Sequence, residues 1–214
     1  QFKKVEAFFK EQTDELTDVE ISVQGEIYRH MAYTWYYFIT QNFARCYRHA
    51  TEWIALVESN NVVLSKDPIF YLKGMHNALS ALFYSNKPRQ FKELLSGFQG
   101  FIDTQSENFD YNTKKLTEVY HYIAQLNNLF LSGKFRGNED FIENLNQWLK
   151  DNVEFLDQNR VQVFHYKIAC LYFGADDFKN CISHLNKIIH SDVKEKYLKQ
   201  DVQCFARILN LVAH

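Results

Sequence analysis

Residues 33–46 read YTWYYFITQNFARC, and residues 168–181, which lie 135 positions further along the chain, read IACLYFGADDFKNC. Both stretches follow the pattern apolar-x3-Tyr-x5-Phe-x2-Cys. Two helices joined by a tight turn would produce this pattern, with an aromatic plug beside the turn and a small residue where the helices cross. Internal similarity of this kind is typical of a stacked array of repeats and argues against one compact enzyme.

The composition favours helices over sheets. Hydrophobic residues make up 46% and aromatic residues 16% of the 214-residue chain, which is enough for a continuous core. The chain holds only two Pro and seven Gly, whereas a β-sandwich or barrel needs a turn signal about every 8–12 residues. We therefore expect an all-α fold.

Apolar residues recur at helical spacing almost throughout the chain. The pattern predicts about ten helices, over residues 2–16, 19–40, 43–58, 68–84, 91–104, 112–132, 139–155, 159–173, 178–190 and 194–212. They pair into four expected hairpins, 19–58, 68–104, 112–155 and 159–190, with a mean period of 45 residues because the 135-residue offset spans three of them. We expect one repeat domain over residues 1–214. The unpaired helix at each end indicates capping helices or a fragment of a longer protein.

Two of these hairpins resemble the tetratricopeptide repeat (TPR). Its pattern is a large apolar residue followed by a small one, then Tyr, an aromatic residue at the turn, and small residues down the second helix. The matching positions are Ile168-Ala169, Tyr172, Asp176-Asp177-Phe178 and Cys181-Ile182, and Tyr33-Thr34, Tyr37, Gln41-Asn42-Phe43, Cys46 and Ala50. In the 112–155 hairpin only the turn matches, at Ser132-Gly133-Lys134-Phe135, and the 68–104 hairpin is degenerate.

The chain departs from the TPR pattern in its turns and in its period. Gln41 and Asp176 stand where the turn Gly is usual, the usual closing Pro is absent, and the period exceeds the family's value of about 34 residues. The resemblance implies a divergent right-handed α-solenoid of antiparallel helix hairpins that binds a partner on its concave face. Another helical repeat and a globular all-α domain stay open as alternatives.

No catalytic or metal-binding constellation emerges from the sequence. None of the eight histidines shows HExxH, HxxxH or zinc-type spacing, so each is expected on the surface or at a helix cap: His30, His49, His76, His121, His165, His184, His190 and His214. Phosphate-binding loops and nucleophile elbows are missing as well. Carboxylate pairs such as Glu139-Asp140 are expected at helix N-termini. We expect no enzyme activity, no cofactor and no metal.

Charge and cysteine content limit the partners and the compartment. The net charge is −2, whereas nucleic-acid-binding domains usually carry a basic stripe, so we expect no nucleic-acid partner. No apolar run approaches the about 20 residues of a membrane span, so we expect no membrane insertion. The four cysteines form no CxxC pair and are expected as buried free thiols in the cytoplasm. A disulfide between Cys170 and Cys181 stays open.

The expected binding surface is the first helix of each hairpin, which lines the concave side of a helical array. The register of the hairpins selects the candidates Tyr28, Met31, Trp35, Phe38, Lys73, Asn77, Tyr122, Gln125, Asn128, Tyr166, Cys170 and Phe173. Asn side chains can pair with the backbone of an extended ligand. The Lys73-x3-Asn77 spacing is similar to the carboxylate clamp of some TPR domains, although its companion residues are not evident. A core role for the aromatic residues is the competing interpretation.

The sequence predicts a non-catalytic interaction scaffold that binds a protein or peptide, whose identity it does not reveal. The alternative function is a ligand- or peptide-sensing regulatory domain of a larger signalling protein. A catalytic all-α enzyme is the third hypothesis. If the scaffold prediction holds, truncating Trp35 or Asn128 to Ala weakens partner binding without unfolding the chain.

Overall fold

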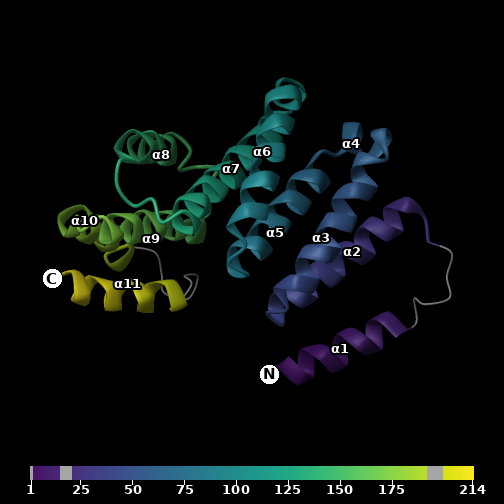
Figure 1. Cartoon of the computed structure of the whole chain (residues 1–214), viewed down its shortest axis with the longest axis horizontal. Coiled ribbons are helices and arrows are strands. Elements are labelled where there is room, and N and C mark those ends of the chain that lie inside the picture. Colours follow the sequence, from purple (N-terminus) through teal and green to yellow (C-terminus); the bar gives the residue numbers. More distant parts are fainter. Residues whose placement is uncertain (1, 15–20, 192–199) are drawn as a thin grey trace. The chain divides into compact units, whose positions relative to one another are not determined.

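The computed structural model describes residues 2–14, 21–191 and 200–214, and these residues form helices and no strand (Figure 1). The α-helices are α1 (Phe2–Asp14), α2 (Val23–Ile39), α3 (Phe43–Glu58), α4 (Asn61–Lys66), α5 (Ile69–Tyr84), α6 (Pro88–Gln105), α7 (Tyr111–Leu131), α8 (Glu139–Asp151), α9 (Gln158–Gly174), α10 (Phe178–Ile189) and α11 (Gln200–Ala213). A short 3-10 helix, η1 (Ser106–Asn108), follows α6. The all-α prediction is confirmed.

The helix boundaries differ from the predicted ones in a few places. The short helix α4 occupies a stretch that the sequence analysis leaves as a connection, and α6 begins at Pro88 rather than at residue 91. Proline suits the first turn of a helix because its missing N–H has no partner there. The helix predicted over 139–155 ends earlier, at Asp151. Parts of the predicted helices at 2–16, 19–40 and 194–212 lie outside the described residues.

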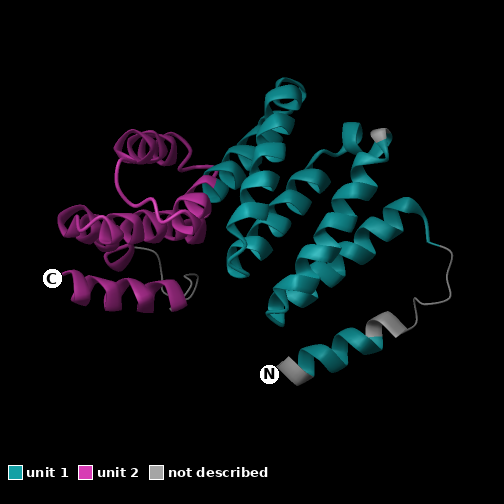
Figure 2. Ribbon diagram, viewed as in Figure 1, with its two compact units in different colours: residues 1–124 teal, residues 125–214 magenta. Residues whose placement is uncertain are grey.

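The chain divides into two compact units, residues 1–124 and residues 125–214, and the division falls inside α7 (Figure 2). Each unit has its own buried apolar residues. The single repeat domain over residues 1–214 stays a prediction.

One turn geometry recurs after α2, α5, α7 and α9. In each turn one residue has a left-handed backbone, with φ of 59°, 51°, 61° and 64° at Gln41, Asn86, Gly133 and Asp176. The next N–H donates to the carbonyl five residues back, at 2.8–3.0 Å, in the pairs Asn42–Tyr37, Lys87–Leu82, Lys134–Leu129 and Asp177–Tyr172. This bond and a left-handed residue define the Schellman motif, which satisfies the free carbonyls at a helix end. The intervals between the turns are therefore 45, 47 and 43 residues.

The two turns of the repeated pattern also share their helix caps. The side chain of Asn42 accepts a hydrogen bond from the backbone N–H of Arg45 at 3.2 Å. The side chain of Asp177 accepts the corresponding bond from Asn180 at 3.1 Å. Asn and Asp are favoured N-caps because their oxygens satisfy a free N–H of the first helical turn. The chain therefore ends one helix and starts the next within three residues.

The core of the first unit is built around α3, which packs against both α2 and α5. The buried residues of α3 recur at helical spacing: Cys46, Ala50, Trp53, Ile54 and Val57. Gly74 of α5 permits a close approach, since a Cβ at this position would lie 2.8 Å from Cγ1 of Ile54. The small residues Cys46 and Ala50 thus lie in the interior, as the repeated pattern predicts.

The core of the second unit joins α9, α10 and α11. Its buried cluster consists of Ala169, Cys181, Leu185, Ile188, Ala206 and Ala213. A Cβ at Gly174 would lie 2.6 Å from Cδ1 of Phe135, so the end of α9 contacts the ring that follows the turn after α7.

All four cysteines carry free thiols. Burial raises the pKa of the Cys46 and Cys181 thiols to about 11, so both stay protonated at neutral pH. Cys204 is exposed and Cys170 is partly buried, so the prediction of buried thiols holds for two of the four. Within the described residues, no helix combines the length and the apolar character that crossing a lipid bilayer requires.

Candidate functional site

The most exposed of the predicted binding residues lie on α2. Trp35 is 48% exposed and Tyr28 is 46% exposed. Ile39, which the sequence analysis does not select, is 54% exposed. These residues are seven and four positions apart, so they lie on one face of the helix. An apolar stripe therefore runs along the solvent side of α2.

The end of α2 meets the end of α5 through aromatic rings. Phe38 makes edge-to-face contacts with Phe43 at 5.8 Å and with Tyr84 at 5.7 Å between ring centroids. Tyr84 also stacks on Phe43 at 5.1 Å and keeps 56% of its surface exposed. Nearer the start of α2, Tyr28 contacts Phe70 of α5 edge-on at 5.5 Å. The exposed side chains of Tyr28, Trp35, Ile39 and Tyr84 are called the α2–α5 aromatic surface below.

The polar candidates on α5 are half-buried. Asn77 donates a hydrogen bond from its side-chain nitrogen to the backbone carbonyl of Lys73 at 2.8 Å. This bond occupies part of the donor capacity that a ligand backbone would need. The pair therefore lies on one helix face, as predicted, but with its amide engaged within the helix.

The remaining candidates are also half-buried. Met31 lies on α2, and Tyr122, Gln125 and Asn128 lie on α7. Burial raises the pKa of the Tyr122 phenol, with a further contribution from the charge of Glu118.

Tyr166 and Phe173 of α9 pack against the apolar cluster of the second unit. Burial raises the pKa of Tyr166 to about 12, and its neighbour Cys170 contributes. Phe173 contacts Phe178 of α10 edge-on at 5.6 Å. The residues of this cluster come from α9, α10 and α11, and α11 lies against both of the other helices.

Four histidines form two pairs that the sequence analysis misses. Nδ1 of His30 lies 3.1 Å from Nδ1 of His49, and Nδ1 of His165 lies 3.2 Å from Nδ1 of His184. Each pair joins two consecutive helices, α2 to α3 and α9 to α10. The expectation of surface or capping histidines is therefore wrong for these four. A signal was present in the sequence, because the second pair stands 135 positions after the first, in the register of the aromatic pattern.

Burial keeps the paired rings neutral. It lowers the pKa of His49 and His165 to about 4 and that of His184 to about 3, and it also lowers the pKa of His30. A desolvated imidazolium is costly because the low-dielectric interior stabilises its charge less than water does. Each neutral pair therefore has two ring nitrogen lone pairs, one of which can accept the N–H of the partner ring across the Nδ1–Nδ1 contact. Among the described residues, the group His30, His49 and Glu52 brings together three side chains that can ligate a metal.

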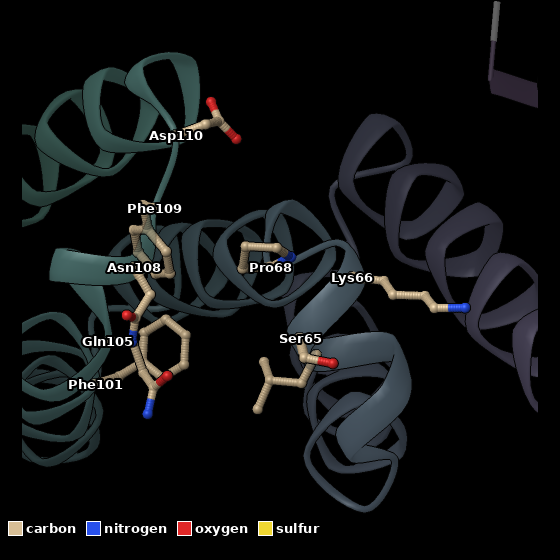
Figure 3. A pocket seen from close by; sticks show the side chains of 9 residues that line it. Ser65, Lys66, Pro68, Phe101, Gln105, Asn108, Phe109 and Asp110 are labelled. Atoms are coloured by element: carbon tan, nitrogen blue, oxygen red, sulfur yellow. The ribbon is translucent and has the colours of Figure 1, made fainter.

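A hollow of about 540 Å³ lies in the first unit, between α4 and the segment from α6 to α7 (Figure 3). Phe101, Phe109 and Pro68 supply apolar walls, and the side chain of Lys66 points away from the other lining residues. The carboxylate of Asp110 accepts hydrogen bonds from both the N–H and the hydroxyl of Thr113. The polar groups that line the hollow do not converge on a common point, so the hollow has the character of a surface depression.

Comparisons with protein-family models, with curated proteins and with solved structures give no match for this chain.

Proposed function

We propose that this chain is a TPR-like helical repeat that binds a protein or peptide partner and catalyses no reaction. Its helix pairs would stack as a right-handed α-solenoid of antiparallel hairpins. The recurrent turn is the observation that carries the proposal. After each of α2, α5, α7 and α9, one residue has a left-handed backbone and the next N–H donates to the carbonyl five residues back. These turns follow one another at intervals near 45 residues. Repetition of one supersecondary unit at a fixed period is the signature of repeat proteins.

The α2–α5 aromatic surface is the proposed binding site. In a TPR-like array the first helix of each pair lines the concave side, and α2 and α5 are the first helices of two successive pairs. Trp and Tyr are enriched at the energetic centres of interfaces because they bury a large area and carry a polar group. Exposed apolar side chains grouped on one face mark partner sites. The surface would hold an extended or helical segment with apolar side chains.

The experiment that tests the proposal compares Trp35→Ala with Trp53→Ala. Trp35 is half-exposed, so its truncation leaves the free energy of unfolding within about 1 kcal/mol of wild type. Trp53 is fully buried, so its truncation costs about 3–5 kcal/mol. Stability is measured by urea unfolding. Partner capture uses a photo-crosslinking amino acid at position 35, followed by mass spectrometry and by titration of the captured protein's contact peptide.

The expected result is a peptide that crosslinks at position 35 and binds Trp35→Ala at least about tenfold more weakly, a loss of about 1.4 kcal/mol. The control is Tyr111→Ala, at a residue that is 66% exposed and lies outside the α2–α5 aromatic surface. It keeps the wild-type affinity. Equal affinity of wild type and Trp35→Ala contradicts the assignment, as does a loss of more than about 2 kcal/mol in the stability of Trp35→Ala, which would place this side chain in the core.

A further inference from the structure

The first histidine pair has a carboxylate beside it. Oε2 of Glu52 lies 3.1 Å from Nδ1 of His30, and that same nitrogen lies 3.1 Å from Nδ1 of His49. The ligand atoms of the three side chains all lie within 4.8 Å of one another. His30 comes from α2, whereas His49 and Glu52 lie one turn apart on α3. The group therefore bridges the two helices of one pair.

Two of these separations are close to those in the first coordination sphere of a transition metal. Two ligand atoms about 2.0–2.1 Å from a tetrahedral Zn²⁺ lie about 3.3 Å apart. Nδ1 of His49 and Oε2 of Glu52 each lie 3.1 Å from Nδ1 of His30, which is close to that spacing. A single ring proton on His30 cannot serve both neighbours with full hydrogen bonds, because Nδ1 carries at most one hydrogen. A cation placed among the three atoms would satisfy all of them.

The surroundings of the group suit a metal ligand set. A neutral imidazole has one ring nitrogen whose lone pair can bind a metal. Nε2 of His30 lies 3.9 Å from a carboxylate oxygen of Glu26, on the side where metal-bound histidines usually find an acceptor. Tyr33 stacks on the ring of His49 at 4.8 Å and fixes its orientation.

Access from solvent and the neighbouring charges affect whether the group can bind a cation. The side chain of Glu52 is 50% exposed, so ions can reach the site from solvent. Two cations, Arg29 and Arg48, act on the histidines and oppose a second positive charge. The guanidinium of Arg29 is paired with the carboxylate of Glu26, which offsets part of this repulsion.

The second histidine pair supplies a natural comparison. His165 and His184 have the same Nδ1–Nδ1 separation within 0.1 Å. The position that corresponds to Glu52 in the 135-residue register is occupied by Lys187. The charge of Lys187 acts on both rings of this pair. An ammonium in place of the carboxylate removes the third ligand and repels a cation, so the two pairs share a geometry but differ in the chemistry needed to hold a metal.

We propose that His30, His49 and Glu52 form a binding site for one divalent transition-metal ion of the Zn²⁺ class, which the second histidine pair lacks. Two imidazoles and one carboxylate are a donor set that Zn²⁺ accepts, with water or a partner side chain as the fourth ligand. A bound ion would tie α2 to α3 across their turn. This site is separate from the α2–α5 aromatic surface, and its test needs no partner protein.

The test is calorimetric titration of the EDTA-stripped chain with ZnCl₂ near neutral pH, repeated with CoCl₂ to record the absorption of a tetrahedral ion. Wild type is expected to take up one equivalent and to gain thermal stability. Glu52→Gln keeps the size and exposure of the side chain, so it is expected to fold. Its affinity falls by more than the about 10- to 100-fold that the loss of an outer-shell partner costs, and its thermal shift with Zn²⁺ disappears.

Two further variants separate this site from other donors. His184→Gln, in the second pair, and Cys204→Ser, at the exposed thiol, are expected to keep the wild-type affinity and stoichiometry. Lys187→Glu restores the missing carboxylate and is expected to raise the uptake to two equivalents. Wild type that binds no Zn²⁺, Glu52→Gln that binds as wild type, or binding that is lost in Cys204→Ser overturns the proposal. Uptake of one equivalent by Lys187→Glu overturns the role given to the carboxylate.

Discussion

The second histidine pair is expected to make the stability of the chain fall steeply in mild acid. Burial lowers the pKa of His165 to about 4 and that of His184 to about 3, from 6.5 in the unfolded chain. Their neutral forms are favoured by folding, so their contribution is complete above the unfolded pKa and is lost as the pH falls toward the folded pKa. As the pH falls from about 7 to about 5, an unfolded histidine changes from about one quarter protonated to almost fully protonated, whereas the folded ring stays neutral, which costs about 2 kcal/mol of stability per ring.

His184→Gln isolates this effect because Gln fills a similar volume, can bond to His165 and does not titrate. The free energy of unfolding is measured with urea at the two pH values, with EDTA present so that no metal competes. The loss of stability from about pH 7 to about pH 5 is expected to be smaller in His184→Gln than in wild type by about 2 kcal/mol.

The matched control is His190→Gln at the exposed histidine that follows α10, which should show the wild-type loss. Equal losses in wild type and His184→Gln would refute the reasoning, because the buried ring would then be as easily protonated as a free one.

Four substitutions, measured by urea unfolding, test the backbone geometry of the turns and the packing around two glycines. Gln41→Gly is expected to stabilise the chain by about 1 kcal/mol because a side chain is strained at its left-handed φ of 59°. Gly133→Ala, at φ of 61°, is expected to destabilise the chain by a similar amount. Equal stability of the two variants would contradict the turn assignment. Gly174→Ala is expected to cost about 1–3 kcal/mol because its Cβ would meet the ring of Phe135 at 2.6 Å. The control is Gly97→Ala on α6, where a Cβ meets nothing within 4 Å, and it should gain up to about 1 kcal/mol of stability from helix propensity. If Gly174→Ala also stabilised the chain, the ring of Phe135 would have to move aside freely.

The turns show how much local signals can predict. The dipeptides Gln41-Asn42 and Asp176-Asp177 resemble the TPR turn although both lack its usual Gly. The structure places Gln41 and Asp176 in the left-handed conformation that Gly would adopt most easily. Asn42 and Asp177 then cap the next helix. The degenerate 68–104 stretch has the same turn at Asn86 because the bonds are made by the backbone, so the motif tolerates residues other than Gly.

The candidate binding residues were harder to predict. Tyr28 and Trp35 are exposed on one face of α2, in keeping with the helical register. The same register selects Tyr166 and Phe173, yet they pack against the cluster that α11 completes. Register assigns a residue to a face of its own helix. It carries no information about which later helix covers that face.

Sequence by itself determined the all-α class, the positions of the turns and the small buried residues of α3 and α10. These features follow from apolar periodicity and from backbone bonds between residues at most five positions apart, so the local chain contains the necessary information. Only the tertiary structure decided that His30 meets His49 and Glu52, and that His165 meets His184. Such contacts depend on how two helix faces are rotated and spaced against each other, and side-chain packing across the interface sets that arrangement.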